Sequence, residues 1–157
     1  MQKITPFLYF DEQAEEAVTL YISLFTNSRV LSMTRYGEGS RKKAGTVFTI
    51  NFVLDGQEFM ALNGGPEFTF TPAVSFMVNC ENQAEVDRLW KKLTEGGEEV
   101  QCGWLKDRYG LSWQIVPVEM FEYLNGKAVQ GSQRAMQAML KMKKIELEKI
   151  RQAYQNE

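Results

Sequence analysis

The sequence predicts an α+β protein built from two copies of a βαβββ unit and a helical tail. Two observations lead to this prediction: an order of strand and helix patterns that occurs twice, and turn residues at the ends of the predicted elements. The composition agrees with a globular chain. Of its 157 residues, 44% are hydrophobic and 24% are charged, and the length suits one ordinary domain or two small fused modules.

The first half of the chain has the pattern strand, helix, strand, strand, strand. Residues 4–10 are rich in aromatic side chains and predict a strand, and Asp11 is the expected N-cap of a helix that continues to about Phe25. Three further strands are predicted at 30–35, 46–54 and 57–63. Asp55 and Gly56 separate the last two strands and predict a two-residue hairpin turn.

The second half repeats this order in a shorter form. A strand is predicted over 74–78, and Asn82 is the expected N-cap of a helix that ends at Gly96 and Gly97. Three short strands follow at 99–102, 104–106 and 111–116. The repeated order indicates an internal duplication, although few letters are identical between the two halves.

The tail after Pro117 differs in composition. One long helix is predicted over 132–155, with several methionines on one side. Such a stripe is typical of packing against the body of the protein or a dimer mate, and alternatively marks a ligand or partner surface. The expected organisation is a first module at 1–66, a second, shortened module at 67–117 and a helical extension at 118–157.

Charge and hydropathy argue against binding to nucleic acid and to a membrane. A formal net charge of −2 offers no surplus of Lys and Arg for nucleic acid. No apolar run approaches the ~20 residues that span a bilayer, and the N-terminus lacks the pattern of a signal peptide. We therefore expect a cytoplasmic protein that binds neither nucleic acid nor membrane.

The absence of histidine excludes several kinds of site. The chain has no His and only two cysteines, Cys80 and Cys102. A Ser-His-Asp or Cys-His nucleophile is therefore impossible, and two cysteines alone cannot complete a four-ligand zinc site. Two cysteines are also too few for a disulfide framework, so we expect both thiols to be reduced.

Several segments in a fixed order carry a resemblance to a known family. They are ITPFLYFD with AEEAVTLYISLF, FMALNGGPEFTFTPAVSFMVNCEN, VDRLWKKLTEGGEE, QCGWLKDRYGLSWQIVP and, in the tail, AMLKMKKIELEKI. With these segments the chain resembles the PhnB-like family, often labelled 3-demethylubiquinone-9 3-methyltransferase, of the glyoxalase / bleomycin resistance / dioxygenase (vicinal oxygen chelate) superfamily. The resemblance implies that the two modules form a curled mixed sheet around a cavity, and that the chain forms a homodimer. It does not settle the activity, because this superfamily supports several chemistries and also pure binding.

Metal-using members of that superfamily bind a divalent cation through His and Glu at four strand positions. Carried over to this chain, the positions fall near Pro6, near Ala73, near Phe59 or Ala61, and on Gln114. None is a carboxylate or an imidazole, and Gln offers only a neutral carbonyl oxygen. The resemblance therefore implies that the metal site is lost, and we expect neither metal nor cofactor.

Strand alternation from these positions selects the side chains that face the implied cavity. The candidate ligand-binding residues are Leu8, Phe10, Phe59, Ala61, Asn63, Ser75, Met77, Trp104, Ser112 and Gln114. This set is apolar with a few neutral polar groups, as in small-molecule pockets. A buried Gln114 needs a partner, since leaving it unpaired costs roughly 1–3 kcal/mol. That partner is a ligand or water or, alternatively, Asn63 or Ser75 across a closed core.

These features favour a metal-free protein that binds a small, partly apolar molecule. Two alternatives stay open. One is an enzyme acting on a small organic substrate, either a methyltransferase of the labelled type or a lyase or dioxygenase. No G-x-G-x-x-G follows a predicted strand, and Cys102 has no histidine to activate it. The other is an interaction protein that uses the Met-rich C-terminal helix.

Overall fold

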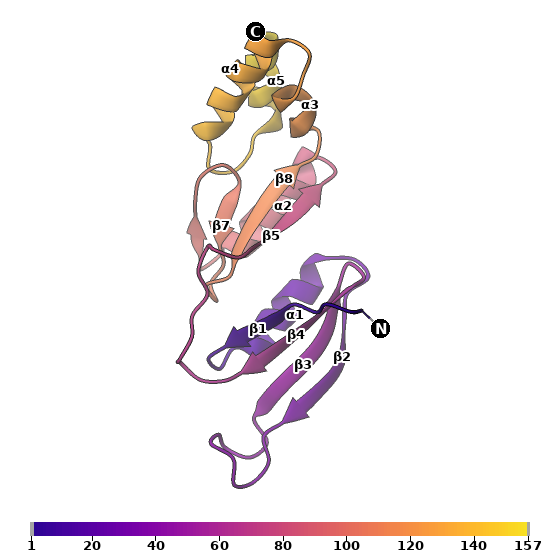
Figure 1. Cartoon of the computed structure of the whole chain (residues 1–157), viewed down its shortest axis with the longest axis vertical. Helices are drawn as coiled ribbons and strands as arrows, with labels where there is room; N and C mark the ends of the chain where they lie inside the picture. The colour runs from indigo at the N-terminus through magenta and orange to yellow at the C-terminus, as the bar shows by residue number, and fades with distance from the viewer. Residues whose placement is uncertain (1, 157) are drawn as a thin grey trace. The chain divides into compact units, whose positions relative to one another are not determined.

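The computed structural model describes residues 2–156, which divide into two compact units, Met1–Phe70 and Thr71–Glu157 (Figure 1). Each unit contains one four-stranded sheet with a helix on one face. Among residues 2–156, no helix has the length and apolar character needed to cross a membrane.

The first unit has the predicted βαβββ order. Its elements are β1 (Phe7–Phe10), α1 (Ala14–Leu24), β2 (Arg29–Arg35), β3 (Val47–Leu54) and β4 (Gln57–Asn63). The strands lie in the order β1-β4-β3-β2. β1 runs parallel to β4, and the other two pairings are antiparallel. The return of β4 to the side of β1 closes the module, a pairing that the order of elements along the chain did not specify.

Helix α1 forms because apolar side chains recur along one of its faces. The buried residues of α1 are Ala14, Ala17, Val18, Tyr21 and Leu24. The predicted cap is wrong. Gln13 occupies the N-cap position and makes no side-chain cap bond, so Asp11 lies ahead of the helix. The Ala14 N–H is bound instead by the Asn63 side chain, at the end of β4.

The hairpin between β3 and β4 agrees with the turn prediction. Asp55 and Gly56 have φ angles of 47° and 81°, so both central residues are left-handed. This is the backbone of a type I′ turn, whose twist matches that of paired strands. The turn sets a register in which Ile50 is opposite Ala61 and Phe52 is opposite Phe59.

The second unit repeats the topology. Its first five elements are β5 (Ser75–Cys80), α2 (Gln83–Thr94), β6 (Glu98–Glu99), β7 (Trp104–Lys106) and β8 (Ser112–Pro117). The sheet order is β5-β8-β7-β6, with β5 parallel to β8. The duplicated α+β architecture predicted from the sequence is thus confirmed.

Helix α2 has the predicted ends. The Asn82 side chain accepts a hydrogen bond of 2.9 Å from the Glu85 N–H, and the Glu85 carboxylate accepts one of 2.8 Å from the Glu81 N–H. The first bond satisfies a donor of the first helical turn, and the second holds the residue that precedes the N-cap. At the other end Gly96 has a φ of 72°, a left-handed conformation that suits glycine after a helix.

The single helix predicted over 132–155 is wrong. The tail contains three helices, α3 (Met120–Leu124), α4 (Val129–Leu140) and α5 (Leu147–Gln155). The break has a tertiary cause, because backbone groups between α4 and α5 bind the sheet. The N–H groups of Cys102 and Gly103 each donate a 2.8 Å bond, to the carbonyls of Met142 and Lys143. A continuous helix would use those carbonyls within itself.

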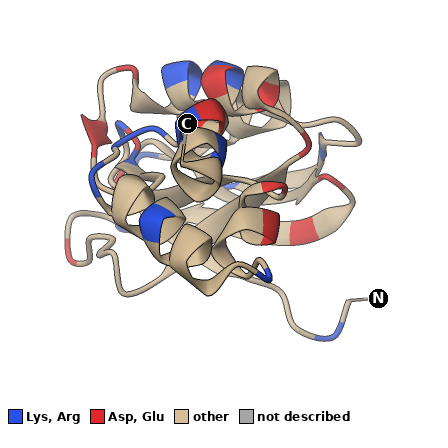
Figure 2. Ribbon diagram, turned by 90° about the horizontal axis from the view of Figure 1, so that it is seen from above, with Lys and Arg blue, Asp and Glu red and all other residues tan. Residues whose placement is uncertain are grey.

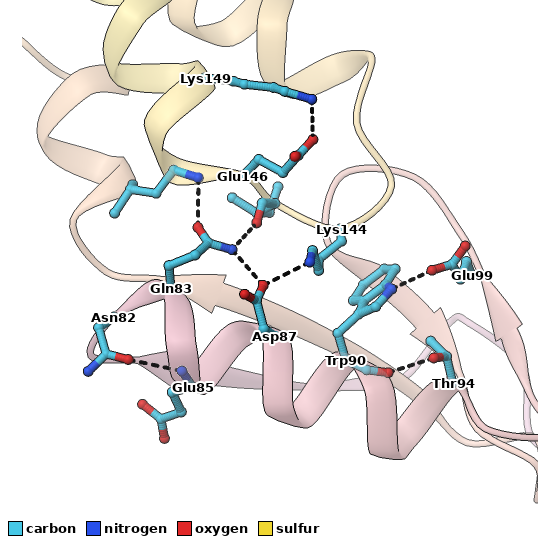
Figure 3. Close-up of polar contacts among 12 residues, drawn as sticks. Asn82, Gln83, Glu85, Asp87, Trp90, Thr94, Glu99, Lys144, Glu146 and Lys149 are labelled. Carbon is cyan, nitrogen blue, oxygen red and sulfur yellow. Dashed lines mark hydrogen bonds and ion pairs between the residues drawn. The ribbon is translucent and has the colours of Figure 1, made fainter.

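Side chains of α2 hold the same connection (Figure 3). Gln83 donates a 2.8 Å hydrogen bond to the Ile145 carbonyl and accepts one of 2.8 Å from the Leu147 N–H. Asp87 forms a 2.8 Å ion pair with Lys144. The tail also has its own core, which includes Val116 at the end of β8. The extension is therefore packed onto the second unit, one of the two arrangements expected for it.

Candidate functional site

The side of the second sheet that faces away from α2 holds the candidate residues of this unit. We call this side the open face of the second unit, defined by Ser75, Met77, Trp104, Lys106, Ser112 and Gln114. The register of β5, β8 and β7 arranges them in two rows. The first row is Ser75, Ser112 and Lys106, and the second is Met77, Gln114 and Trp104. The strand alternation that the sequence predicted here agrees with this register.

Gln114 has a protein partner on this face. Its side-chain amide donates a 3.0 Å hydrogen bond to the Ser75 hydroxyl. Ser75 was one of the two protein partners considered from the sequence. Both residues are half-buried, and Met77 next to Gln114 is 49% exposed. The pair therefore lies at an accessible surface rather than in a closed core.

The opposite side of this sheet is packed against α2. Leu105, Trp113 and Ile115 are at most 2% exposed. Beside them, the Asp107 carboxylate accepts hydrogen bonds from the Trp113 indole at 2.9 Å and from the Tyr109 and Leu111 N–H groups. Asp107 thus holds the turn before β8.

The predicted orientation of the first unit's candidates is wrong. All five are buried, with exposures between 0% and 8%: Leu8, Phe10, Phe59, Ala61 and Asn63. They lie on the side of the sheet that packs against α1. Asn63 shows this orientation directly, because its side-chain oxygen accepts a 2.8 Å hydrogen bond from the Ala14 N–H at the start of α1. Its side-chain amide donates a 3.1 Å bond to the Val47 carbonyl.

The other side of the first sheet is the accessible one. We call it the open face of the first unit, and its register rows contain Phe7, Tyr9, Asn51, Met60 and Leu62. Phe7 is 52% exposed. The side-chain oxygen of Asn51 is buried and has no hydrogen-bond partner among residues 2–156. Desolvation, with a smaller contribution from the Glu67 carboxylate, raises the pKa of Tyr9, so its phenol stays protonated at neutral pH.

The residues of these two open faces do not fit a divalent metal. The ligand-type groups are the neutral amides of Gln114 and Asn51, a protonated phenol at Tyr9 and the thioethers of Met60 and Met77. Divalent cations of this type favour imidazole or carboxylate ligands. In the described range 2–156, no three His, Cys, Asp or Glu side chains are grouped to hold a metal ion.

The two thiols occupy different environments. Cys80 is fully buried, and desolvation raises its pKa to about 12. Cys102 is half-buried and has a left-handed φ of 57° at the bend before β7. Both are free cysteines, as predicted. Cys80 is a structural thiol with almost no thiolate at neutral pH.

Two concave regions lie outside the open faces. In the first unit, a pocket of about 420 Å³ is lined by acidic residues at the start of α1 and by Arg35, Tyr36 and Lys42, where Lys42 approaches Glu12 at 3.9 Å. In the tail, a shallow groove is lined by Leu124, Val129 and Met136. Figure 2 shows both acidic and basic segments on the helix at the C-terminus.

Residues 2–116 match the family model described as 3-demethylubiquinone-9 3-methyltransferase. The tail motif AMLKMKKIELEKI, which formed part of the expected resemblance, lies outside this match. A search of curated proteins gives no match.

Solved structures extend the comparison. A putative 3-demethylubiquinone-9 3-methyltransferase, PhnB protein, from Bacillus cereus is 43% identical, with 74% of this chain and 99% of that chain covered and a TM-score of 0.70. Protein PA1353 from Pseudomonas aeruginosa is 23% identical, with 73% and 96% covered and a TM-score of 0.61. The YycE protein of Bacillus subtilis, titled a putative glyoxalase/fosfomycin resistance protein, is 17% identical, with 72% and 87% covered and a TM-score of 0.51. The last two share the fold alone.

Proposed function

We propose that this chain binds a small, partly apolar molecule without the help of a metal ion. The chain belongs to the 3-demethylubiquinone-9 3-methyltransferase family. The binding surface is the open face of the second unit. The observation that carries the proposal is the hydrogen-bonded pair of Gln114 and Ser75 on an accessible sheet surface. A neutral amide thus stands at the position to which the family resemblance assigns a metal ligand.

The surroundings of this pair support binding of an organic molecule. Met77 and Trp104 flank Gln114 in the same row and present a thioether and an indole. A few orienting hydrogen-bonding groups within an apolar surface are the usual composition of small-molecule sites. Met77 at 49% exposure is available to be covered by a ligand.

Native mass spectrometry with elemental analysis tests the proposal on protein purified without chelators or a His tag. We expect a metal-free protein that carries, or takes up, an organic mass, and we expect the homodimer that the family resemblance implies. A Gln114→Leu variant should lose the bound mass, whereas Gln137→Leu on the exposed surface of α4 should retain it. A stoichiometric metal ion would contradict the proposal.

A thermal-shift screen gives an independent measurement. A compound present at 100 times its dissociation constant stabilises the folded state by about 2.7 kcal/mol. We expect at least one apolar compound with a hydrogen-bonding group to raise the melting temperature of the wild type and not that of Gln114→Leu. A broad library without any stabilising compound would count against binding.

The description of the family model favours methyl transfer as a second candidate function. The glycine-rich segment after β4 runs on to β5 without a helix, so it does not provide the helix N-terminus of a nucleotide-binding loop. Incubation with S-adenosylmethionine and a demethylated quinol tests this candidate. Transfer of the methyl group that Gln114→Leu abolishes would replace the binding proposal by an enzymatic one.

A further inference from the structure

We propose that the molecule bound on the open face of the second unit is a small organic oxyanion with an apolar body. Its anionic group would bind at Lys106 and Ser112, and its apolar part would cover Trp104 and Met77. The inference rests on the proposed binding function and names the class of ligand.

The charge of Lys106 is the first observation behind this inference. Its register partner on β8 is Ser112, so its side chain belongs to the open face. No hydrogen bond or ion pair joins the Lys106 ammonium to any other residue of the range 2–156. Glu98, opposite Lys106 on β6, also lies beyond ion-pair distance. A half-buried cation that forms no ion pair can take an anionic ligand as its partner.

Ser112 is the second, independent observation. It lies between Ser75 and Lys106 in the first row and is only 2% exposed. Within the described part of the chain, its hydroxyl makes no hydrogen bond. Asn51 Oδ1 is the one fully buried polar side-chain atom without a partner in residues 2–156, so the Ser112 hydroxyl is not sealed inside the sheet and is available to a ligand on the open face. Lys106 and Ser112 are register partners on neighbouring strands, whose backbones are about 4.8 Å apart. We infer that the flexible Lys106 side chain can bring its ammonium to a carboxylate or phosphoryl group that this hydroxyl contacts.

The second row determines the rest of the ligand. Met77, Gln114 and Trp104 lie two residues along their strands from the first row, at a spacing of about 7 Å. The indole of Trp104 and the thioether of Met77 are suited to a flat or flexible apolar group. The ligand should therefore carry its oxyanion about 7 Å from the centre of its apolar part.

Three related probes test the inference: 3-phenylpropionate, 2-phenylethylphosphonate and the neutral 3-phenylpropanamide. Binding is followed by the indole N–H resonance of Trp104 in ¹⁵N-labelled protein, assigned with Trp104→Phe. We expect both anions to bind about tenfold more tightly than the amide, and Lys106→Met to remove this preference. The resonances of Trp90 and Trp113, on the α2 side of the sheet, should not shift.

Lys92→Met, which removes an exposed cation from α2, is the matched control and should leave every affinity within about twofold. The stronger of the two anions identifies the type of oxyanion. If the amide binds as tightly as the anions and Lys106→Met changes nothing, the oxyanion inference is overturned while the binding function stands. If no probe shifts Trp104 and native mass spectrometry finds no organic ligand, both fail.

Discussion

The Asn63 side chain binds the start of helix α1, across 49 residues of sequence. Its oxygen accepts a 2.8 Å hydrogen bond from the Ala14 N–H, and its amide donates a 3.1 Å bond to the Val47 carbonyl. Because the N-cap residue of α1 makes no side-chain bond, β4 supplies the capping acceptor. Asn63 therefore connects the helix to two strands of the first unit.

Removal of this cap should destabilise the first unit. We expect Asn63→Ala to lower the free energy of unfolding by about 1–3 kcal/mol, because a buried helix donor and a buried carbonyl lose their partner. Urea denaturation followed by far-UV circular dichroism measures the change. Asn79→Ala on β5, where the side chain is exposed, is the control. Equal stability of the two variants would rule out a capping role.

The Gln83 side chain should control how firmly the tail is packed. Gln83→Ala leaves the Ile145 carbonyl and the Leu147 N–H without their partner. We expect a loss of roughly 1–3 kcal/mol and faster amide hydrogen exchange between α4 and α5. Gln137→Ala, an exposed change on α4, should leave the exchange unaltered. Unchanged exchange in Gln83→Ala would mean that the tail is held by its apolar core alone.

The Asp87–Lys144 ion pair makes the tail sensitive to acid. The Lys144 ammonium, through its hydrogen bond, lowers the pKa of Asp87, with a smaller contribution from Gln83. Because the pKa of Asp87 is lower in the folded state, its ionised carboxylate stabilises the folded protein at any pH above the usual Asp pKa of about 3.9. This stabilisation is lost as the pH falls through the pKa of Asp87 in the folded state. The protection factors of the amides between α4 and α5, which correct for the slower intrinsic exchange in acid, should therefore fall below about pH 4. Asp87→Asn should remove this acid-dependent step, and its persistence in that variant would assign it to another carboxylate.

Asp107 should be essential for the turn before β8. We expect Asp107→Ala to cost on the order of 1.5–3 kcal/mol, since three donors, including the Trp113 indole, lose a charged acceptor. Thermal unfolding monitored by tryptophan fluorescence measures the effect. Glu38→Ala in the exposed loop after β2 should stay within about 0.5 kcal/mol. A comparable loss in both variants would contradict the assigned role.

The two cysteines should react at different rates. Because desolvation raises the pKa of Cys80 to about 12, almost none of its thiolate exists at pH 8. Iodoacetamide should therefore modify the half-buried Cys102 of the native protein first, and Cys80 only after unfolding. Peptide mass mapping distinguishes the two sites. Rapid labelling of native Cys80 would show that its surroundings open far more easily than its burial indicates.

Local patterns predicted the elements of the fold well, because they depend on neighbouring residues. The Asp55–Gly56 turn and the Asn82 cap depend on residues close together in the sequence, and both have the expected geometry. Strand orientation in the first unit was harder to predict. Both sides of β1 are apolar, with Phe7 and Tyr9 on one side and Leu8 and Phe10 on the other. Alternation without a polar side carries no information on which side is buried.

A signal for the correct orientation was present on the neighbouring strand. Thr49 and Asn51 are the polar residues of β3, and they share a side of the sheet with Met60 and Leu62. Asn63 obscured this signal because it is polar and yet lies on the buried side. Its polarity serves the start of α1, a contact made across 49 residues. In the second unit Ser112 and Gln114 alternate with Trp113 and Ile115, so the sequence predicted which side of β8 is polar.

The sequence by itself determined the duplicated α+β architecture, the Asp55–Gly56 turn, the Asn82 cap of α2, and the polar row and Gln114 in the second unit. Periodicity and turn chemistry act between near neighbours, which suffices for these features. Only the tertiary structure decided which side of the first sheet is buried, where α1 obtains its cap and where the tail breaks into separate helices. Each depends on hydrogen bonds or packing between residues far apart in the chain, such as Asn63 with Ala14 and Gln83 with Leu147. Such partners become neighbours only when the chain folds.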